Sequence, residues 1–145
     1  MNIPQYITVA EVQRVCRALG LRDWTKLKKP NVTEKEARLI LKIVNVKKMP
    51  IAVEDFRVGL EVELEHGTMF DEANVTNNHP LLTGMIVLAH MKETLDYYTR
   101  LDVAEIEGDL LKAVLSKNMD KIQAKYKKLI KAQAALNKVV AAQLK

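Results

Sequence analysis

Hydrophobic residues recur every three or four positions through most of the chain, which is the period of a helix that packs on one side. The first stripe predicts a helix that begins after Thr8, because "TVAE" is a capping box in which the Thr8 hydroxyl accepts from the Glu11 backbone N–H and Glu11 reaches back. Gly20 is a typical helix end. A second capping box, "TEKE", opens the next helix at Thr33, so residues 1–50 are expected to form a helical pair.

A third amphipathic stripe predicts a helix from Val53 to His66, which Gly67 ends. The following segment, "TMFDEANVTNNHP", has the composition of an irregular connection. Asn78 is the expected N-cap of the fourth helix, with Pro80 in its first turn, where the missing N–H costs nothing.

The stretch from Leu81 to Met91 is apolar almost all round, which is typical of a helix at the centre of a bundle. The pattern becomes amphipathic after Glu93 and continues to Ser116, so the fourth helix is expected to run on through that range. No stretch predicts a strand, because the β-branched runs "KIVNV" and "MIVL" each lie inside a helical pattern. A last helix is expected from about Asn118.

Along that last helix, apolar side chains lie alternately three and four residues apart for about three heptads, interrupted by the polar Gln133. Such a seam predicts burial against another helix, either of this chain or of a second copy. The expected partner-binding residues are Met119, Ile122, Tyr126, Leu129, Leu136 and Val140.

These patterns together predict an all-α fold: a small bundle of about five helices with a long, amphipathic, heptad-patterned basic helix at its C-terminal end. The length of 145 residues is that of one domain, 1–145. We expect it to comprise the N-terminal pair, a helical core over 51–116 and the basic helix over 117–145.

Composition narrows the classes of function. Only 5% of the residues are aromatic, so a surface that stacks nucleic-acid bases is not expected. The longest apolar run, "LLTGMIVLAHM", is too short to span a membrane, and the first residues lack the pattern of a secretory signal. We therefore expect cytoplasmic synthesis without secretion, with a virion as a further location. Cys16 has no disulfide partner and is interpreted as a small buried hydrophobe.

The net charge of +5 is concentrated at one end of the chain. Residues 117–145 contain eight Lys and one Asp, and the remainder is nearly neutral at −2. The expected basic face consists of Lys121, Lys125, Lys128, Lys131 and Lys138. These lysines could follow nucleic-acid phosphates by charge alone, but the helix has no Arg for bidentate contacts. The seam favours a protein partner, namely like subunits or a larger assembly.

Two pairs of ionisable residues suggest a metal site. Glu63 and His66 lie three residues apart, as do His90 and Glu93, so each pair shares a helix face. If the two helices pack antiparallel, two carboxylates and two imidazoles converge, a set that binds zinc, iron or manganese. A ferritin-like di-metal bundle needs Glu-x-x-His on two helices, and here one pair is reversed.

The alternative interpretation is a polar seam in which His90, Glu93 and Tyr97 hydrogen-bond between packed helices. The expected cofactor is accordingly none, with a divalent metal as the alternative. The sequence has no HExxH, no phosphate-binding Gly-rich loop, no nucleophile elbow and no paired cysteines, which disfavours catalysis.

The segments "FRVGLEVELEHG" and "NVTNNHPLLTGMIVLAHMKETLDYYTRL" resemble an uncharacterised family of small bacterial, archaeal and phage-associated proteins. The shared pattern is Gly-x-x-x-Glu-Leu-Glu-His-Gly, an Asn-Val-Thr turn, then Thr-Gly-x-Ile-x-Leu-Ala-His followed by Glu and Asp-Tyr-Tyr. The resemblance covers about Phe56 to Leu101, implies a shared helical core without an assigned activity, and leaves the first two helices and the basic tail outside. The implied core residues are Glu63, His66, Gly67, Asn74, Thr76, Gly84, His90, Glu93 and Tyr97.

The preferred hypothesis is a non-enzymatic structural or assembly protein that acts through protein–protein contacts, with a phage virion or capsid-associated component as its most concrete form. The second hypothesis is a metal-binding helical domain, either a ferritin-like oxidoreductase or a structural metal site. The third is a basic protein that binds nucleic acid or the ribosome.

Overall fold

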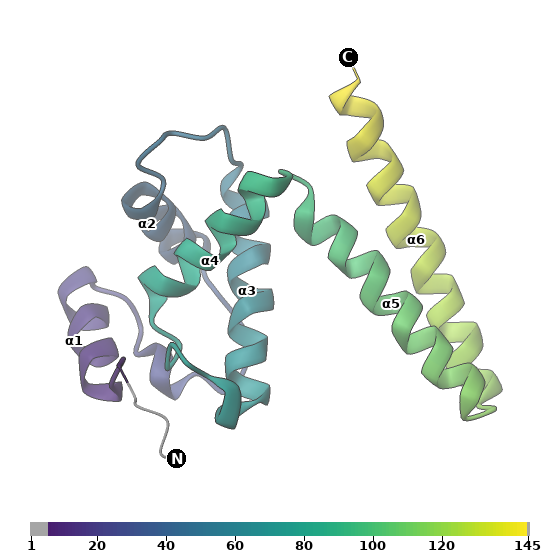
Figure 1. Ribbon diagram of the computed structural model, residues 1–145, viewed down its shortest axis with the longest axis horizontal. Coiled ribbons are helices and arrows are strands. Elements are labelled where there is room, and N and C mark those ends of the chain that lie inside the picture. The colour runs from purple at the N-terminus through teal and green to yellow at the C-terminus, as the bar shows by residue number, and fades with distance from the viewer. Residues whose placement is uncertain (1–5, 145) are drawn as a thin grey trace. The chain divides into compact units, whose positions relative to one another are not determined.

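The computed structural model describes residues 6–144, and all regular secondary structure in that range is helical, which confirms the all-α prediction (Figure 1). Six α-helices follow one another: α1 Val9–Leu19, α2 Glu34–Val44, α3 Val53–Met69, α4 Pro80–Glu93, α5 Tyr97–Leu115 and α6 Met119–Gln143. Two short 3₁₀ turns, η1 Trp24–Lys26 and η2 Asp71–Ala73, lie in the connections.

The chain divides into two compact units, Met1–Glu93 and Thr94–Lys145. The division falls where the sequence predicts one continuous fourth helix, which is wrong: α4 ends at Glu93 and α5 begins at Tyr97. In the connection Asp96 accepts hydrogen bonds from Thr94 and Arg100. The single domain over 1–145 stays a prediction.

The two helix starts predicted from capping boxes, at Thr8 and Thr33, are both present. The Thr8 hydroxyl accepts from the Glu11 backbone N–H at 3.2 Å, but the Glu11 carboxylate pairs with Arg14 in place of the cap, so only half of that box forms. The box at Thr33 forms in both directions, and Gly20 ends α1 at φ 65° as predicted.

The core of the first unit forms where α4 packs against α2 and α3, as the all-apolar pattern of α4 predicts. Gly84 brings the backbone of α4 close to α2, because a Cβ at this position would lie 2.6 Å from the Ile40 Cγ2 atom. The largest fully buried side chains include Trp24, Ile40, Phe56, Leu60, Leu64 and Met91.

Gly67 does not end α3, contrary to the prediction, and the helix continues to Met69. The glycine instead makes room for the loop that follows. A Cβ on Gly67 would lie 2.1 Å from the Asn78 side-chain oxygen and 3.2 Å from the Asn74 amide nitrogen. The glycine is therefore required by packing and not by helix termination.

The second unit is an antiparallel hairpin of α5 and α6 (Figure 1). Lys117 turns the chain at φ 53°, and the Asn118 side chain caps α6 by accepting from the Lys121 backbone N–H at 3.0 Å. Near the turn the Lys125 ammonium lies 2.5 Å from the Asp109 carboxylate, and at the other end Gln143 donates to Asp96 at 3.3 Å.

Gly67 in α3 and Gly108 in α5 predict opposite effects of the same substitution. Gly67→Ala should lower the free energy of unfolding by about 1–3 kcal/mol, because the new methyl group displaces the hydrogen-bonded Asn78 side chain. Gly108→Ala should raise it by about 0.5–1 kcal/mol, since nothing lies within 4 Å of the added Cβ and alanine favours helix. Urea unfolding of both variants measures the difference, and destabilisation of equal size would contradict this account.

Candidate functional site

The structure brings together three of the four residues predicted to bind metal. Glu63 on α3 lies 3.6 Å from the His90 Nε2 atom on α4 and 3.9 Å from the His66 Nδ1 atom on its own helix. The Glu63 side chain is only 16% exposed, whereas His66 is 55% exposed and Glu93 faces solvent at the end of α4. The predicted set is therefore reduced to one carboxylate between two imidazoles.

Within residues 6–144 no group of three or more His, Cys, Asp or Glu side chains is arranged to hold a metal ion. A metal at Glu63, His66, His90 and Glu93 stays a prediction, and of these four residues the structure brings the first three together. The polar seam of His90, Glu93 and Tyr97 stays a prediction, and the contact seen at His90 is with Glu63 on the facing helix. Beside this cluster a shallow hollow of about 200 Å³ is lined by residues that include Phe70, Val75 and Ile86.

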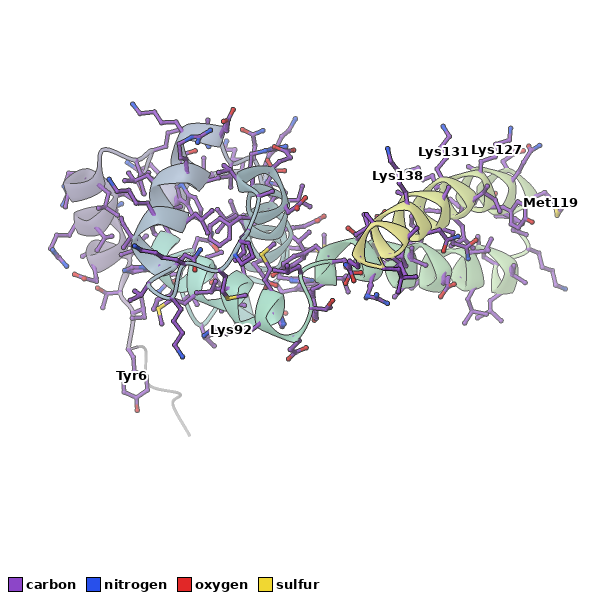
Figure 2. All side chains as sticks on the ribbon, turned by 90° about the horizontal axis from the view of Figure 1, so that it is seen from above. Tyr6, Lys92, Met119, Lys127, Lys131 and Lys138 are labelled. Carbon is purple, nitrogen blue, oxygen red and sulfur yellow. The ribbon has the colours of Figure 1, made fainter. Side chains whose placement is uncertain are left out.

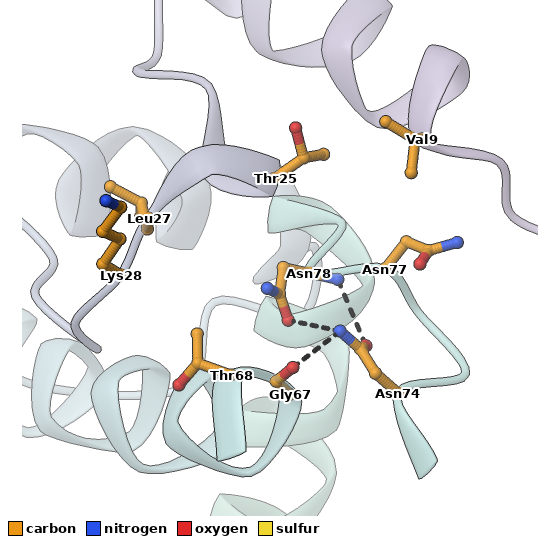
Figure 3. Close-up of a pocket in the computed structure, with 9 residues that line it drawn as sticks. All are labelled: Val9, Thr25, Leu27, Lys28, Gly67, Thr68, Asn74, Asn77 and Asn78. Carbon is orange, nitrogen blue, oxygen red and sulfur yellow. Dashed lines mark hydrogen bonds between the residues drawn. The ribbon is translucent and has the colours of Figure 1, made fainter. Parts of the chain in front are cut away.

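A second hollow, of about 280 Å³, lies beside the asparagine-rich loop (Figure 3). The Asn74 amide donates to the Gly67 carbonyl at 2.9 Å and to the Asn78 side chain at 3.0 Å, while its oxygen accepts from the Asn78 backbone N–H. Asn77 donates to the Ile7 carbonyl. Each of these amides thus holds the loop in place, which explains the "NVTNN" sequence without a ligand.

His79, and not Asn78, caps α4. The His79 Nδ1 atom accepts from the Leu82 backbone N–H at 3.3 Å, and its carbonyl accepts from Thr83. Asn78 has φ 59° and is occupied by Asn74, so the predicted cap residue is wrong by one position. Pro80 lies in the first turn as predicted.

The buried position of His79 changes its titration. Burial lowers the pKa of His79 and outweighs the opposing effects of its backbone hydrogen bond and of Glu11, while Arg14 lowers the pKa further.

The His79 cap predicts a loss of stability in mild acid. Because its folded-state pKa lies below the ordinary value of 6.5, the stabilisation is complete above about pH 6.5 and is lost as the pH falls below it. His79→Asn keeps a capping side chain but removes the titration, so the free energy of unfolding should fall less between pH 8 and pH 5.5 than in the wild type. Urea unfolding at the two pH values measures this, and an unchanged pH dependence would count against the cap.

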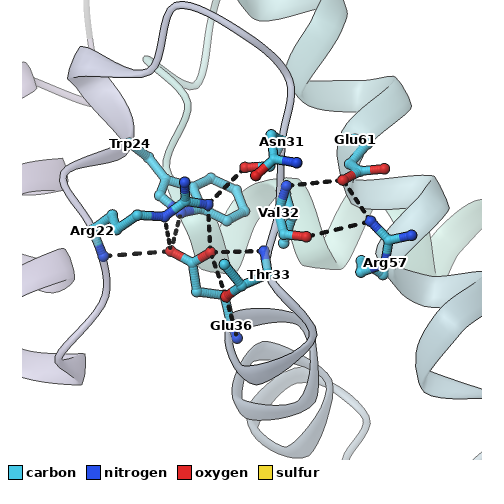
Figure 4. A network of polar contacts seen from close by, with 8 residues as sticks. All are labelled: Arg22, Trp24, Asn31, Val32, Thr33, Glu36, Arg57 and Glu61. Atoms are coloured by element: carbon cyan, nitrogen blue, oxygen red, sulfur yellow. Dashed lines mark hydrogen bonds and ion pairs between the residues drawn. The ribbon is translucent and has the colours of Figure 1, made fainter.

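A buried carboxylate joins the N-terminal connection to α2 (Figure 4). Glu36 accepts from the Arg22 guanidinium at 2.6 Å, from the Trp24 indole N–H at 3.3 Å and from the Thr33 backbone N–H at 2.9 Å. Burial alone would raise the pKa of Glu36, but these hydrogen bonds outweigh it and lower the pKa to about 2. The network explains why Trp24 is fully buried, and it fixes the first unit without forming a reactive site.

Glu36→Gln should lower the free energy of unfolding at pH 7 by about 3 kcal/mol, because it breaks a buried ion pair. The folded pKa lies below the ordinary value of 4.5, so the stabilisation is present above about pH 4.5 and is lost as the pH falls toward 2. Glu34→Gln is the matched control on the same helix, since its pair with Arg38 is exposed and contributes below about 1 kcal/mol. Equal losses in urea unfolding of the two variants would contradict the role given to Glu36.

Only part of the predicted partner-binding seam of α6 packs against α5 in the hairpin. Leu129 is buried against α5, and Ile122, Leu136 and Val140 are partly buried, but Tyr126 is 56% exposed and Met119 is 73% exposed. Lys125 takes the position expected for Tyr126, because it pairs with Asp109 on α5. The contact thus keeps four of the predicted seam residues and is displaced toward Lys125 and Ala132 by less than one residue.

The lysines of α6 avoid one side of the helix. At about 100° per residue, an arc of about 120° beside the contact with α5 carries no charged residue along the whole helix. Of the predicted basic face, Lys125 faces α5, whereas Lys131 and Lys138 point away from α5, as does the neighbouring Lys127 (Figure 2). The uncharged arc comprises Met119, Gln123, Tyr126, Ile130, Gln133, Asn137 and Val140.

In an antiparallel pair, α5 presents Val103, Leu110 and Val114 on the same side as that arc, with the exposed Glu107 at the outer edge of this stripe. Val114 is 49% exposed and Ile130 is 49% exposed. We call the uncharged arc of α6 together with these three residues the uncharged side of the hairpin.

The model of a family described as "Protein of unknown function (DUF5661)" matches residues 12–107. The chain belongs to this family. The match begins within α1, so the N-terminal helical pair lies inside the family and not outside it as expected. It ends within α5, so α6 lies beyond the matched residues. Searches of the curated proteins and of the solved structures gave no match to the chain.

No helix among residues 6–144 is long and apolar enough to cross a membrane.

Proposed function

We propose that the protein is a non-enzymatic assembly protein that binds further copies of itself through the uncharged side of the hairpin. The observation that carries the proposal is the absence of charge along that side of α6, although the helix contains six lysines and one aspartate. Solvated helix faces are ordinarily charged, and a side that is both apolar and free of charge is typical of a contact surface. A virion as the setting of this assembly is a further proposal, and it rests on the resemblance alone.

The packing within the hairpin supports the same conclusion. A helix is stabilised mainly by burial of its apolar face, and small units need a further element to complete a core. Among the described residues from Thr94 onward, only Asp96, Tyr98, Ala113, Leu129 and Ala132 are buried. The two helices thus leave much of their apolar surface open, including Leu111 and Leu115 at 58% and 74% exposure.

Introducing a charge on the uncharged side should weaken self-association. Ile130→Glu is expected to lower the association constant by at least about tenfold, because it buries an unpaired carboxylate in the contact. Ala135→Glu is the matched control, since Ala135 is exposed and lies on the lysine-bearing side of α6. Sedimentation velocity of the full-length variants at 5–100 µM, a range about that of weak dimers, measures both constants.

Wild-type protein that stays monomeric over that range would contradict the proposed function. An equal weakening by Ile130→Glu and Ala135→Glu would show that added charge, and not the uncharged side, controls association.

Nucleic-acid binding is the second candidate, and the exposed lysines on the opposite side of α6 support it. Because α6 has no Arg and its aromatic residue Tyr126 lies on the uncharged side, such binding would follow backbone charge alone. Fluorescence anisotropy with a labelled DNA duplex should then show affinity that falls steeply with salt, and a flat response would exclude it.

A further inference from the structure

We infer that two copies pair with α5 of one hairpin over α6 of the other, forming an antiparallel four-helix bundle with both hairpin turns at the same end. This inference rests on the proposed self-assembly and specifies its geometry. Two identical hairpins that meet face to face can be related by a two-fold axis along the helices or by one across them. The first places α5 on α6 of the second copy, and the other places like helix on like helix.

The charges of the two helices favour the first arrangement. Within its bounds α6 contains six lysines and one aspartate, whereas α5 contains four acidic residues and two basic ones. Packed helices lie about 8–10 Å apart, which is close to the Debye length at physiological salt, so their charges are only partly screened. Like-on-like packing would set two strongly basic helices side by side, and the crossed arrangement sets each basic helix beside an acidic one.

The contacts within the hairpin fix which residues then meet. The contacts Asp109–Lys125 and Asp96–Gln143 each join two residues at about the same height along the hairpin. They therefore align the residues of α5 with those of α6. Leu110 is therefore level with Tyr126. An axis along the helices preserves these levels between copies, so Leu110 of one copy faces Tyr126 of the other.

By the same alignment Val114 faces Gln123 of the second copy and Val103 faces Gln133. Each apolar α5 residue thus meets an uncharged α6 residue, no lysine enters the contact, and Glu107 lies at its edge, level with Ile130 of the second copy. The shared surface is large enough for a specific contact. At 1.5 Å per residue α5 is about 28 Å long, and two helices are about 20 Å wide, so two copies bury on the order of 1,000 Å² in total. That reaches the lower bound of specific interfaces.

Disulfide cross-linking between copies tests the arrangement in full-length protein. In a Cys16→Ala background, Leu110→Cys protein mixed with Tyr126→Cys protein should form a disulfide-linked heterodimer under mild oxidation. Val114→Cys mixed with Gln123→Cys is a second pair at exposed positions, where neither change removes buried packing. Each single-cysteine protein alone should cross-link at least about tenfold less, because like helices lie diagonally across the bundle.

Efficient cross-linking of Tyr126→Cys with itself would overturn the inference in favour of like-on-like packing. Dimers by sedimentation that give neither heterodimer would overturn the inference and leave the proposed function standing. Monomers by sedimentation would overturn both.

Added salt gives an independent test of the arrangement. The association constant should fall by about two- to fivefold between 50 and 500 mM NaCl, which is the size of a few exposed charge pairs. An association constant that rises with salt would contradict the arrangement.

Discussion

A hairpin of two helices can bury only one stripe of each helix, and the sequence of the second unit supplies more apolar surface than that single contact covers. The contact between α5 and α6 uses Ala113, Leu129 and Ala132 and is fixed by the pair of Asp109 with Lys125. What lies beside it, around Tyr126 and Ile130, is exposed and free of charge. The proposed assembly follows from this excess of apolar surface over the partners available within the hairpin.

The first unit has a different character, because its polar groups are occupied within the fold. Glu36 is held by Arg22, Trp24 and Thr33, and the asparagines of the loop hold one another and the end of α3. The residues of the pattern on which the resemblance rests therefore include several whose role in this chain is structural: Gly67 gives room to Asn78, and Gly84 gives room to Ile40. The cluster of Glu63 with two histidines is the part of that pattern whose chemistry is least explained by packing.

Much of the fold could be predicted from the sequence, because helix periodicity and caps are local signals. The capping box at Thr33 and the helix end at Gly20 were identified correctly. The failures arise where a distant contact overrides a local signal. Gly67 reads as a helix end, but Asn78 requires it inside α3, and Tyr126 reads as a seam residue, but Asp109 draws Lys125 into that position. The His79 cap had no local signal, since histidine is an uncommon N-cap.

The central claim is that the hairpin, and not the first unit, is completed by a second copy. Amide hydrogen exchange measured on the full-length protein at two concentrations, about tenfold below and tenfold above the dissociation constant, tests it most directly. The account predicts that protection of α5 and α6 rises with protein concentration while that of α2, α3 and α4 stays the same. Protection that does not depend on concentration in α5 and α6, or that rises in the first unit instead, would contradict it.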